Sequence, residues 1–155
     1  MMPEIELHPM TEMEFADYRV VALADNREDL PTGSWRTRDE AQTRFAAAFN
    51  DGLQTVGIAC YAIRTATATV GFMICQEARR SATRECFILD FHILPAFRRQ
   101  SYATASIRQL REIATSLGYD QIGLSVLPNN EAAERLYCRC GFEPAFTRFQ
   151  LPLRP

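Results

Sequence analysis

The spacing of apolar residues changes several times along the chain, and each change predicts a new helix or strand. Runs that are continuous or alternate in twos are typical of strands, whereas apolar residues three and four apart indicate a helix face. The expected strands are Ile5–His8, Val56–Arg64, Thr69–Gln76, Arg84–Leu94, Gln121–Leu127 and Ala145–Leu153. The expected helices run from Thr11 to about Ala24, from Asp39 to about Asn50, from Ala103 to Leu117 and from Glu131 to Cys140. This order predicts one mixed α/β domain, with an antiparallel meander in its middle and a polar turn at Glu77–Thr83.

A strand, a tight loop and a long helix follow one another between Ile88 and Gly118. Pro95 cannot donate to a sheet ladder and ends the strand. A helix N-terminus that faces the end of a central strand offers unpaired N–H groups and a partial positive charge. Arg98 and Arg99 lie at this position, so the unit suits a phosphate-bearing ligand. On pattern alone, an ordinary strand–helix unit explains it equally well.

A second strand–helix unit follows, in which Pro128 ends the strand and Asn130 is placed to cap the helix. The residues that stand out in the two units are Arg98-Arg99-Gln100-Ser101-Tyr102-Ala103 and then Asn130, Ala133, Leu136, Tyr137, Gly141 and Phe142. In this order and spacing they resemble the two signatures of the GNAT superfamily of acyl-CoA N-acyltransferases, Gln/Arg-x-x-Gly-x-Gly/Ala and Asn-x-x-Ala-x-x-Leu-Tyr-x-x-x-Gly-Phe. The resemblance is sharpest over residues 88–144, and the order of elements extends it to nearly the whole chain.

The resemblance implies an α/β (α+β) fold: a mixed, mainly antiparallel central sheet of about six to seven strands with about four helices on both faces. It implies a single N-acetyltransferase domain over residues 1–155. It also implies acetyl-CoA as co-substrate and an acceptor with a primary amine, either a small molecule or a protein, which attacks the thioester directly in a ternary complex. In the superfamily the first two helices and the loop between them, here Asp25–Thr37, form one wall of the acceptor cleft. They are the least recognisable part of this chain, so the acceptor stays unidentified.

The resemblance also assigns the parts of CoA to parts of the chain. The pyrophosphate suits the backbone N–H groups of the loop and of the first helical turn. The amide-rich pantetheine arm suits strand backbone exposed where two parallel strands splay, with Leu124 and Val126 on the second strand. Without the resemblance, Thr104 and Asn130 would be simple helix caps, and the two arginines solvated charges. The expected cofactor-binding residues are Ile93, Leu94, Arg98, Arg99, Gln100, Ser101, Tyr102, Ala103, Thr104, Asn130 and Tyr137.

Ser101 departs from the pattern, because it occupies the position of the first signature glycine. Glycine serves such a loop by tolerating unusual backbone dihedrals and by letting a phosphate approach closely. Serine permits a version of the turn that tolerates a Cβ, and its hydroxyl is able to bond a phosphate oxygen. The opposite consequence, weaker CoA binding, also stays open.

Tyr137 matches the tyrosine that protonates the departing CoA thiolate in many relatives. A phenol, with an ordinary pKa of about 10, can protonate a thiolate held within hydrogen-bond reach. The alternative is a half-buried helix aromatic beside Leu136.

Asp90 and His92 are the candidates for removing a proton from the acceptor's ammonium group. Alternation places Ile88, Asp90, His92 and Leu94 on one face of the strand, and Leu89, Phe91 and Ile93 on the other. An imidazole, with an ordinary pKa of about 6.5, matches the task better than a carboxylate does. The resemblance favours Asp90, since an acidic residue three positions before that of Ile93 is common in the superfamily. Asp90 would act through water or hold the acceptor's cation; the alternative is a hydrogen-bonded pair beside solvent.

Composition excludes several classes of function. A net charge of −2 argues against a nucleic-acid binder, and the chain has no apolar run of about 18 residues that could span a membrane. The first residues lack a signal-peptide pattern, and five cysteines form an odd set without metal-site spacing. These features predict a cytoplasmic protein with reduced thiols and no metal. Relatives often form homodimers, sometimes through their last strands, so the resemblance extends to that expectation.

Two other functions compete with the enzyme. A regulatory domain that binds acyl-CoA without turnover is motivated by Ser101 and by the open choice of base. A nucleotide-binding strand–helix domain would need its glycines after the first strand, and fits poorly.

Overall fold

The computed structural model describes residues 1–24, 38–149, 151 and 153. The strands are β1 (Glu6–Pro9), β2 (Ile58–Arg64), β3 (Thr69–Arg80), β4 (Thr83–Ile93) and β5 (Gln121–Leu124). The helices are α1 (Glu12–Ala22), α2 (Arg38–Ala48), α3 (Tyr102–Ser116) and α4 (Glu131–Arg139), with short 3-10 helices η1 (Gly52–Gln54) and η2 (Pro95–Phe97). The expected loop Asp25–Thr37 lies outside the described residues.

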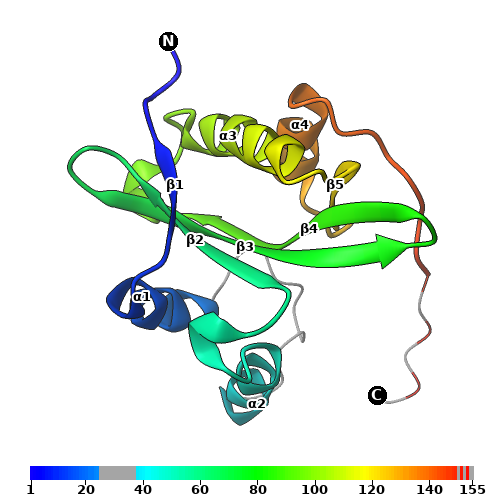
Figure 1. The fold of residues 1–155 in the computed structure, drawn as a ribbon, viewed down its shortest axis with the longest axis horizontal. Coiled ribbons are helices and arrows are strands. Elements are labelled where there is room, and N and C mark those ends of the chain that lie inside the picture. Colours follow the sequence, from blue (N-terminus) through cyan, green and yellow to red (C-terminus); the bar gives the residue numbers. More distant parts are fainter. Residues whose placement is uncertain (25–37, 150, 152, 154–155) are drawn as a thin grey trace.

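The strands form one mixed sheet in the order β1-β2-β3-β4-β5. The first three pairings are antiparallel, and β4 pairs with β5 in parallel through the crossover helix α3. Helices cover both faces: α3 and α4 lie on one side of the sheet, and α1 and α2 on the other (Figure 1). The α/β class, the mixed sheet and the four helices therefore agree with the expectation.

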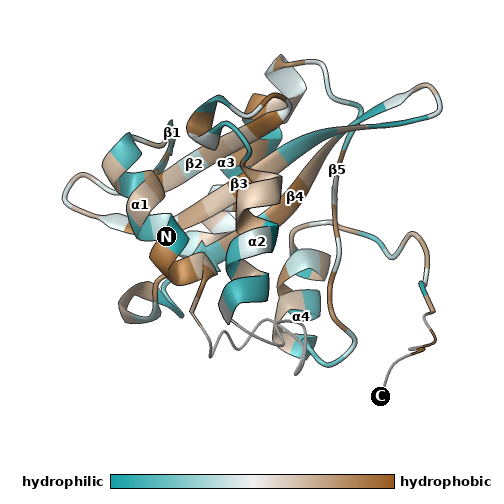
Figure 2. Cartoon of the chain, turned by 90° about the horizontal axis from the view of Figure 1, so that it is seen from below, coloured by the Kyte–Doolittle hydropathy of each residue, from teal (hydrophilic) through white to brown (hydrophobic). Residues whose placement is uncertain are grey.

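Each face of the sheet has its own hydrophobic core. Beneath α3, the side chains of Ile63, Met73 and Leu110 are at most 1% exposed. On the opposite face, α1 and α2 lie over the strands (Figure 2). The aromatic cluster there has ring centroids 4.6 to 6.4 Å apart and consists of Phe15, Tyr18, Phe45, Phe49 and Phe72.

In the described part of the chain the sheet has five strands, so the expectation of six to seven strands is wrong. The described part of the expected strand Ala145–Leu153 forms no strand. Its large apolar side chains are 71% exposed at Phe146 and 91% at Phe149. A strand needs a neighbour to pair with, and the four-residue β5 offers a short edge. Pro144 and Pro152 remove two backbone donors as well.

The hairpin of β3 and β4 is longer than the sequence suggested. Most of the expected turn at Glu77–Thr83 is paired strand, and only Ser81 and Ala82 separate the two strands. Charged side chains rather than apolar ones connect this part: Arg84 Nε lies 3.3 Å from Glu77 Oε1 and Arg80 Nε lies 3.6 Å from Glu85 Oε1. A polar extension of this kind has no apolar alternation to reveal it.

No helix among the described residues has the length and apolar character that crossing a membrane requires.

Candidate active site

The parallel strands β4 and β5 separate at the point where the candidate site begins. Their last register pair is Ile88 with Leu124, while β4 continues to Ile93. A β-bulge lies immediately after that pair. Cys75 of β3 pairs with Ile88 and Ile74 pairs with Asp90, so Leu89 is the additional residue of β4 that has no partner on β3. A bulge bends its strand and increases the local twist. The bend coincides with the end of β5, the place at which the resemblance implies that the two strands splay.

The bulge corrects the predicted assignment of faces. Asp90 and Leu94 face α1 and α2, as does His92, which pairs with Phe72, but Ile88 packs in the opposite core beneath α3. The prediction that Ile88 shares a face with Asp90 is therefore wrong. Simple alternation fails because the extra residue Leu89 resets the phase of the strand.

The loop after β4 contains the backbone conformations for which glycine is favoured. Arg99 has φ 63°, and Ser101 has φ 64° and ψ 10°, both in the left-handed region. Ser101 is the N-cap of α3, yet its side chain makes no capping hydrogen bond. The first turn of α3 therefore presents backbone N–H groups that lack intrahelical acceptors. Donors of this kind, after residues with positive φ, form an anion-binding concavity.

The side chains of the loop are fixed by local hydrogen bonds. Arg98 Nε donates to the carbonyl oxygen of Ile93 at 3.0 Å, and Gln100 Nε2 donates to that of Ala96 at 3.2 Å. The Leu94 N–H donates to Val70 O of β3 at 2.9 Å. Because successive peptide groups point to opposite edges of a strand, the Ile93 N–H faces the side of the splay. Of the two expected pantetheine contacts, Ile93 is therefore the better placed.

Cys140, at the end of α4, lies near Thr104 at the beginning of α3. Burial raises the pKa of the Cys140 thiol, and a hydrogen bond with the Thr104 side chain opposes that rise. Thr104 lies inside the first turn of α3, so the alternative that it caps the helix is wrong. Tyr137 lies about one turn before Cys140, on a neighbouring part of the same helix surface.

Asn130 lies at the N-cap of α4 and Tyr137 lies within the helix. Asn130 caps the helix, since its Oδ1 accepts from the Ala133 N–H at 3.1 Å. The Tyr137 ring is half-buried and meets the Phe142 ring edge-on, with centroids 5.5 Å apart.

Asp90 has a partner that sequence reasoning missed. The hydroxyl of Tyr18, a residue only 4% exposed, donates to Asp90 Oδ2 at 2.8 Å. This bond joins α1 to β4 across the aromatic cluster. The backbone is closely packed here too, because a Cβ built on Gly71 of β3 would collide with the carbonyl oxygen of His92. Asp90 and His92 thus lie on a tightly held segment of β4, facing α1.

The comparisons with known proteins agree with this geometry. The model of the Acetyltransferase (GNAT) family matches residues 7–142. A fold with splayed parallel strands, a glycine-type loop and an open helix N-terminus defines the class, and the family match covers most of the chain. The chain belongs to the GNAT family of acetyltransferases.

The individual relatives and solved structures have low sequence identity to this chain, between 15% and 28%. The chain is 28% identical over 145 residues to the uncharacterized N-acetyltransferase YycN of Bacillus subtilis, which covers 90% of this chain and 92% of that protein. The crystal structure of YycN superposes with a TM-score of 0.83 at 24% identity, covering 98% of this chain and 100% of that one. AAC(6')-Iy bound to the bisubstrate analogue CoA-S-monomethyl-acetylneamine gives a TM-score of 0.69 at 15% identity, covering 98% and 99%.

Proposed function

We propose that the protein transfers the acetyl group of acetyl-CoA to a primary amine by direct attack in a ternary complex. The observation that carries the proposal is the arrangement at the end of β4, where a bulge, a strand splay and an open helix N-terminus follow one another within residues 88–104. The acceptor is a small molecule or a protein. A neighbour of the same fold was solved with an analogue that joins CoA to an aminoglycoside-type amine.

The loop and the first turn of α3 suit the pyrophosphate of CoA. The N–H groups near Ser101 lack a side-chain cap, and Arg99 adds a guanidinium. The pantetheine arm would lie in the splay, where the Ile93 N–H faces it. Arg98 reaches back to the Ile93 carbonyl oxygen, so its role is to fix the turn as well as to add positive charge.

Tyr137 is the proposed proton donor to the CoA thiolate. The interaction of Cys140 with Thr104 supports this role, because Tyr137 lies about one helical turn before Cys140 on α4. The half-buried ring and its edge contact with Phe142 restrict its orientation.

Asp90 and His92 have different roles towards the acceptor: one binds and orients its amine, and the other removes a proton from it. Asp90 accepts a hydrogen bond from the buried Tyr18 hydroxyl at 2.8 Å, which fixes the orientation of its carboxyl group. A carboxylate in this position suits the acceptor's cation, while an imidazole two residues on suits removal of its proton. The proposed base is thus His92, with Asp90 orienting the amine.

The first test is calorimetric titration with acetyl-CoA, using CoA and ATP as comparisons. We expect micromolar binding of both CoA species and none of ATP. A panel of primary amines is then screened by release of the CoA thiol. Binding of acetyl-CoA without thiol release across a broad panel would instead favour the regulatory acyl-CoA-binding domain, which no comparison supports. If neither acetyl-CoA nor CoA binds, the proposed cofactor site is wrong.

A further inference from the structure

A pocket of about 150 Å³ lies at the end of α3 opposite the phosphate-binding loop. The helix residues that line it are in the C-terminal half of α3, from Leu110 to Leu117. With a rise of about 1.5 Å per residue, Ala114 lies about 18 Å along the helix from Tyr102. The pocket is therefore separate from the candidate active site. A cavity of about this size lined by apolar side chains can hold a molecule such as benzene.

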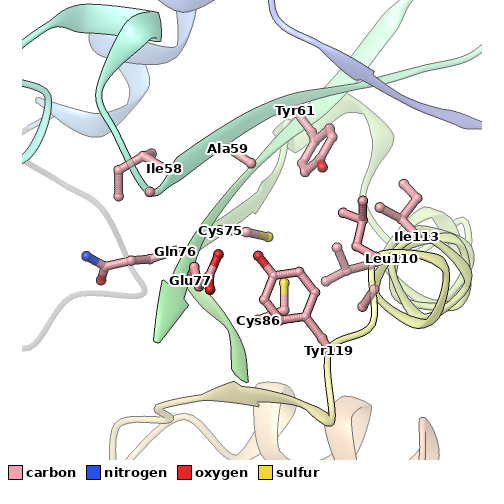
Figure 3. A pocket seen from close by; sticks show the side chains of 13 residues that line it. Ile58, Ala59, Tyr61, Cys75, Gln76, Glu77, Cys86, Leu110, Ile113 and Tyr119 are labelled. Carbon is pink, nitrogen blue, oxygen red and sulfur yellow. The ribbon is translucent and has the colours of Figure 1, made fainter. Parts of the chain in front are cut away.

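Two thiols line this pocket between its apolar walls. The sulfur atoms of Cys75 and Cys86 lie beside Leu110 and Tyr119 (Figure 3), and the residues are 3% and 6% exposed. The two thiols interact, which lowers the pKa of Cys86 and raises that of Cys75. By contrast, burial alone raises the pKa of Cys60 to about 11.

The mouth of the pocket is held in place by charged groups. The Tyr119 hydroxyl hydrogen-bonds with the Glu77 carboxylate. The Arg84 guanidinium lies 4.6 Å from the centroid of the Tyr119 ring and 3.3 Å from Glu77 Oε1. Arg84 also donates to the carbonyl oxygen of Leu117 at 3.0 Å. These interactions fix the Tyr119 ring, which lines the pocket.

The strand register separates two kinds of thiol chemistry. Cys75 faces Ile88 and Cys86 faces Glu77, so the two cysteines are diagonal neighbours on one face. Diagonal neighbours lie about 7–8 Å apart, whereas a disulfide needs Cα atoms within about 4.4–6.8 Å. A direct S–S bond would require the strands to move. An atom bonded to both sulfurs at about 2.3 Å each, a usual metal–thiolate length, spans a wider separation than a direct S–S bond of about 2.05 Å does.

The two cysteines are the protein ligands available to an atom that bridges them, so this atom must be stable with two bonds to the protein. Among the described residues, no group of three or more histidine, cysteine or acidic side chains could hold a metal ion. Zinc, which takes four ligands in structural sites, therefore fits poorly. A neutral product is also favoured, because the thiols are buried and an uncompensated charge would be costly.

We propose that Cys75 and Cys86 form a dithiol site that captures a monosubstituted trivalent arsenical, whose organic group occupies the apolar part of the pocket. The arsenical R–As=O reacts with the two thiols. Two S–H bonds break, two As–S bonds form, and the oxygen leaves as water with both protons, so no electrons are transferred. The product is neutral, and the arsenic is fully coordinated by its organic group and two sulfurs.

Phenylarsine oxide is the probe, added in slight excess to the full-length protein and followed by intact-mass spectrometry after gel filtration. We expect one phenylarsenic group per chain, removed by 2,3-dimercaptopropanol but not by a monothiol. The variants Cys75→Ser and Cys86→Ser should each lose the adduct, while Cys138→Ser and Cys140→Ser should keep it. Loss of the adduct with Cys138→Ser or Cys140→Ser, or no adduct on the wild type, overturns the proposal.

A second measurement needs no variant, in case a buried substitution prevents folding. The wild-type adduct is denatured and alkylated with iodoacetamide, and the peptides are mapped. We expect Cys60, Cys138 and Cys140 to be alkylated and the other two cysteines to be protected. Alkylation of Cys75 and Cys86 at the level of the other three would overturn the proposal.

Discussion

Ser101 holds a backbone conformation that glycine adopts more easily. Its φ of 64° costs a residue with a Cβ about 1–2 kcal/mol, while glycine loses about 0.5–1 kcal/mol more entropy on folding. We therefore expect Ser101→Gly to leave the free energy of unfolding equal or up to about 1 kcal/mol higher. The affinity for CoA should be equal or tighter, as measured by titration calorimetry.

Ser101→Ala is the matched control, because it keeps the Cβ and removes only the hydroxyl. If both variants bind CoA markedly less well, the serine hydroxyl contributes directly to binding. The backbone explanation would then be insufficient.

Tyr137→Phe tests the proposed proton donor. The variant keeps the ring and its edge contact with Phe142. Because a proton donor acts mainly in the transition state, kcat should fall by about tenfold or more, with little change in acetyl-CoA affinity. The measurement is thiol release with a competent amine, alongside calorimetry. Unchanged turnover would remove Tyr137 from this role.

Tyr18→Phe tests whether the buried phenol positions Asp90. A hydrogen bond to a charged acceptor contributes about 1.5–3 kcal/mol, so a loss of roughly tenfold in kcat/KM is expected. The effect should disappear in the Asp90→Asn background, which a double-mutant cycle measures. Tyr61→Phe, on the other face of the sheet, is the control. Equal losses with and without Asp90 would mean that the Tyr18 hydroxyl supports only the fold.

Individual residues differed in how far the sequence could place them. Ser101, Asn130 and Tyr137 belong to local motifs, and the cap at Asn130 follows from local chemistry. The cap suggested at Thr104 was wrong, because α3 begins two residues earlier and its N-cap, Ser101, makes no side-chain capping bond. Tyr18 could not be found, because on a helix with apolar neighbours it is indistinguishable from a core aromatic. Its partner Asp90 is 72 residues away in the chain, and only the tertiary fold brings them together.

At the scale of elements, the carboxylate of Glu14 connects the first turn of α1 to β2. Glu14 forms a capping box with Thr11 and also accepts from Arg64 Nε at 2.7 Å and Nη2 at 2.6 Å. The hydrogen bonds from Arg64 lower the pKa of Glu14 from 4.5 to about 2. Since the folded pKa is depressed, this stabilisation is present above pH 4.5 and is lost as the pH falls towards about 2.

We therefore expect Glu14→Gln to destabilise the protein at neutral pH by about 1–2 kcal/mol. The difference from the wild type should shrink as the pH falls through that window, as followed by urea denaturation at several pH values. Glu12→Gln, at an exposed position in the same helical turn, is the control and should change little. A difference that stays constant down to pH 2 would contradict the role of Glu14 ionisation.

The elements were predictable where local pattern decides them. The strand, loop and helix from β4 to α3 follow from the apolar spacing, from Pro95 and from Gly118, whose φ is 75°. The bulge at Leu89 was not predictable, because the sequence Ile88–Leu94 alternates acceptably in two registers and β3 selects one. The end of β3 from Glu77 to Arg80 was missed because it has no apolar alternation, and ion pairs connect it to β4 instead.

At the scale of the whole molecule, the segment after α4 is the part least explained by one chain. Its side chains are exposed at Phe149, Leu151 and Leu153 to 91%, 82% and 89%, and they alternate in twos as in a strand. Contiguous exposed apolar groups mark interaction surfaces. The strand order also leaves β5 at the edge of the sheet, where a further strand can pair. A second copy of the chain offers such a strand.

We expect the protein to form a homodimer in solution in which these segments become buried. Light scattering coupled to gel filtration should give twice the chain mass over a wide range of concentration. Phe149→Ser combined with Leu151→Ser should shift the equilibrium towards monomer, because apolar burial contributes about 1.5–3 kcal/mol per large side chain. Met13→Ser combined with Val20→Ser, which changes two exposed apolar residues on α1, is the control and should leave the mass unchanged. A wild type that is monomeric at all concentrations would show that the alternating segment serves no self-association, and its exposed side chains would then have to meet another surface.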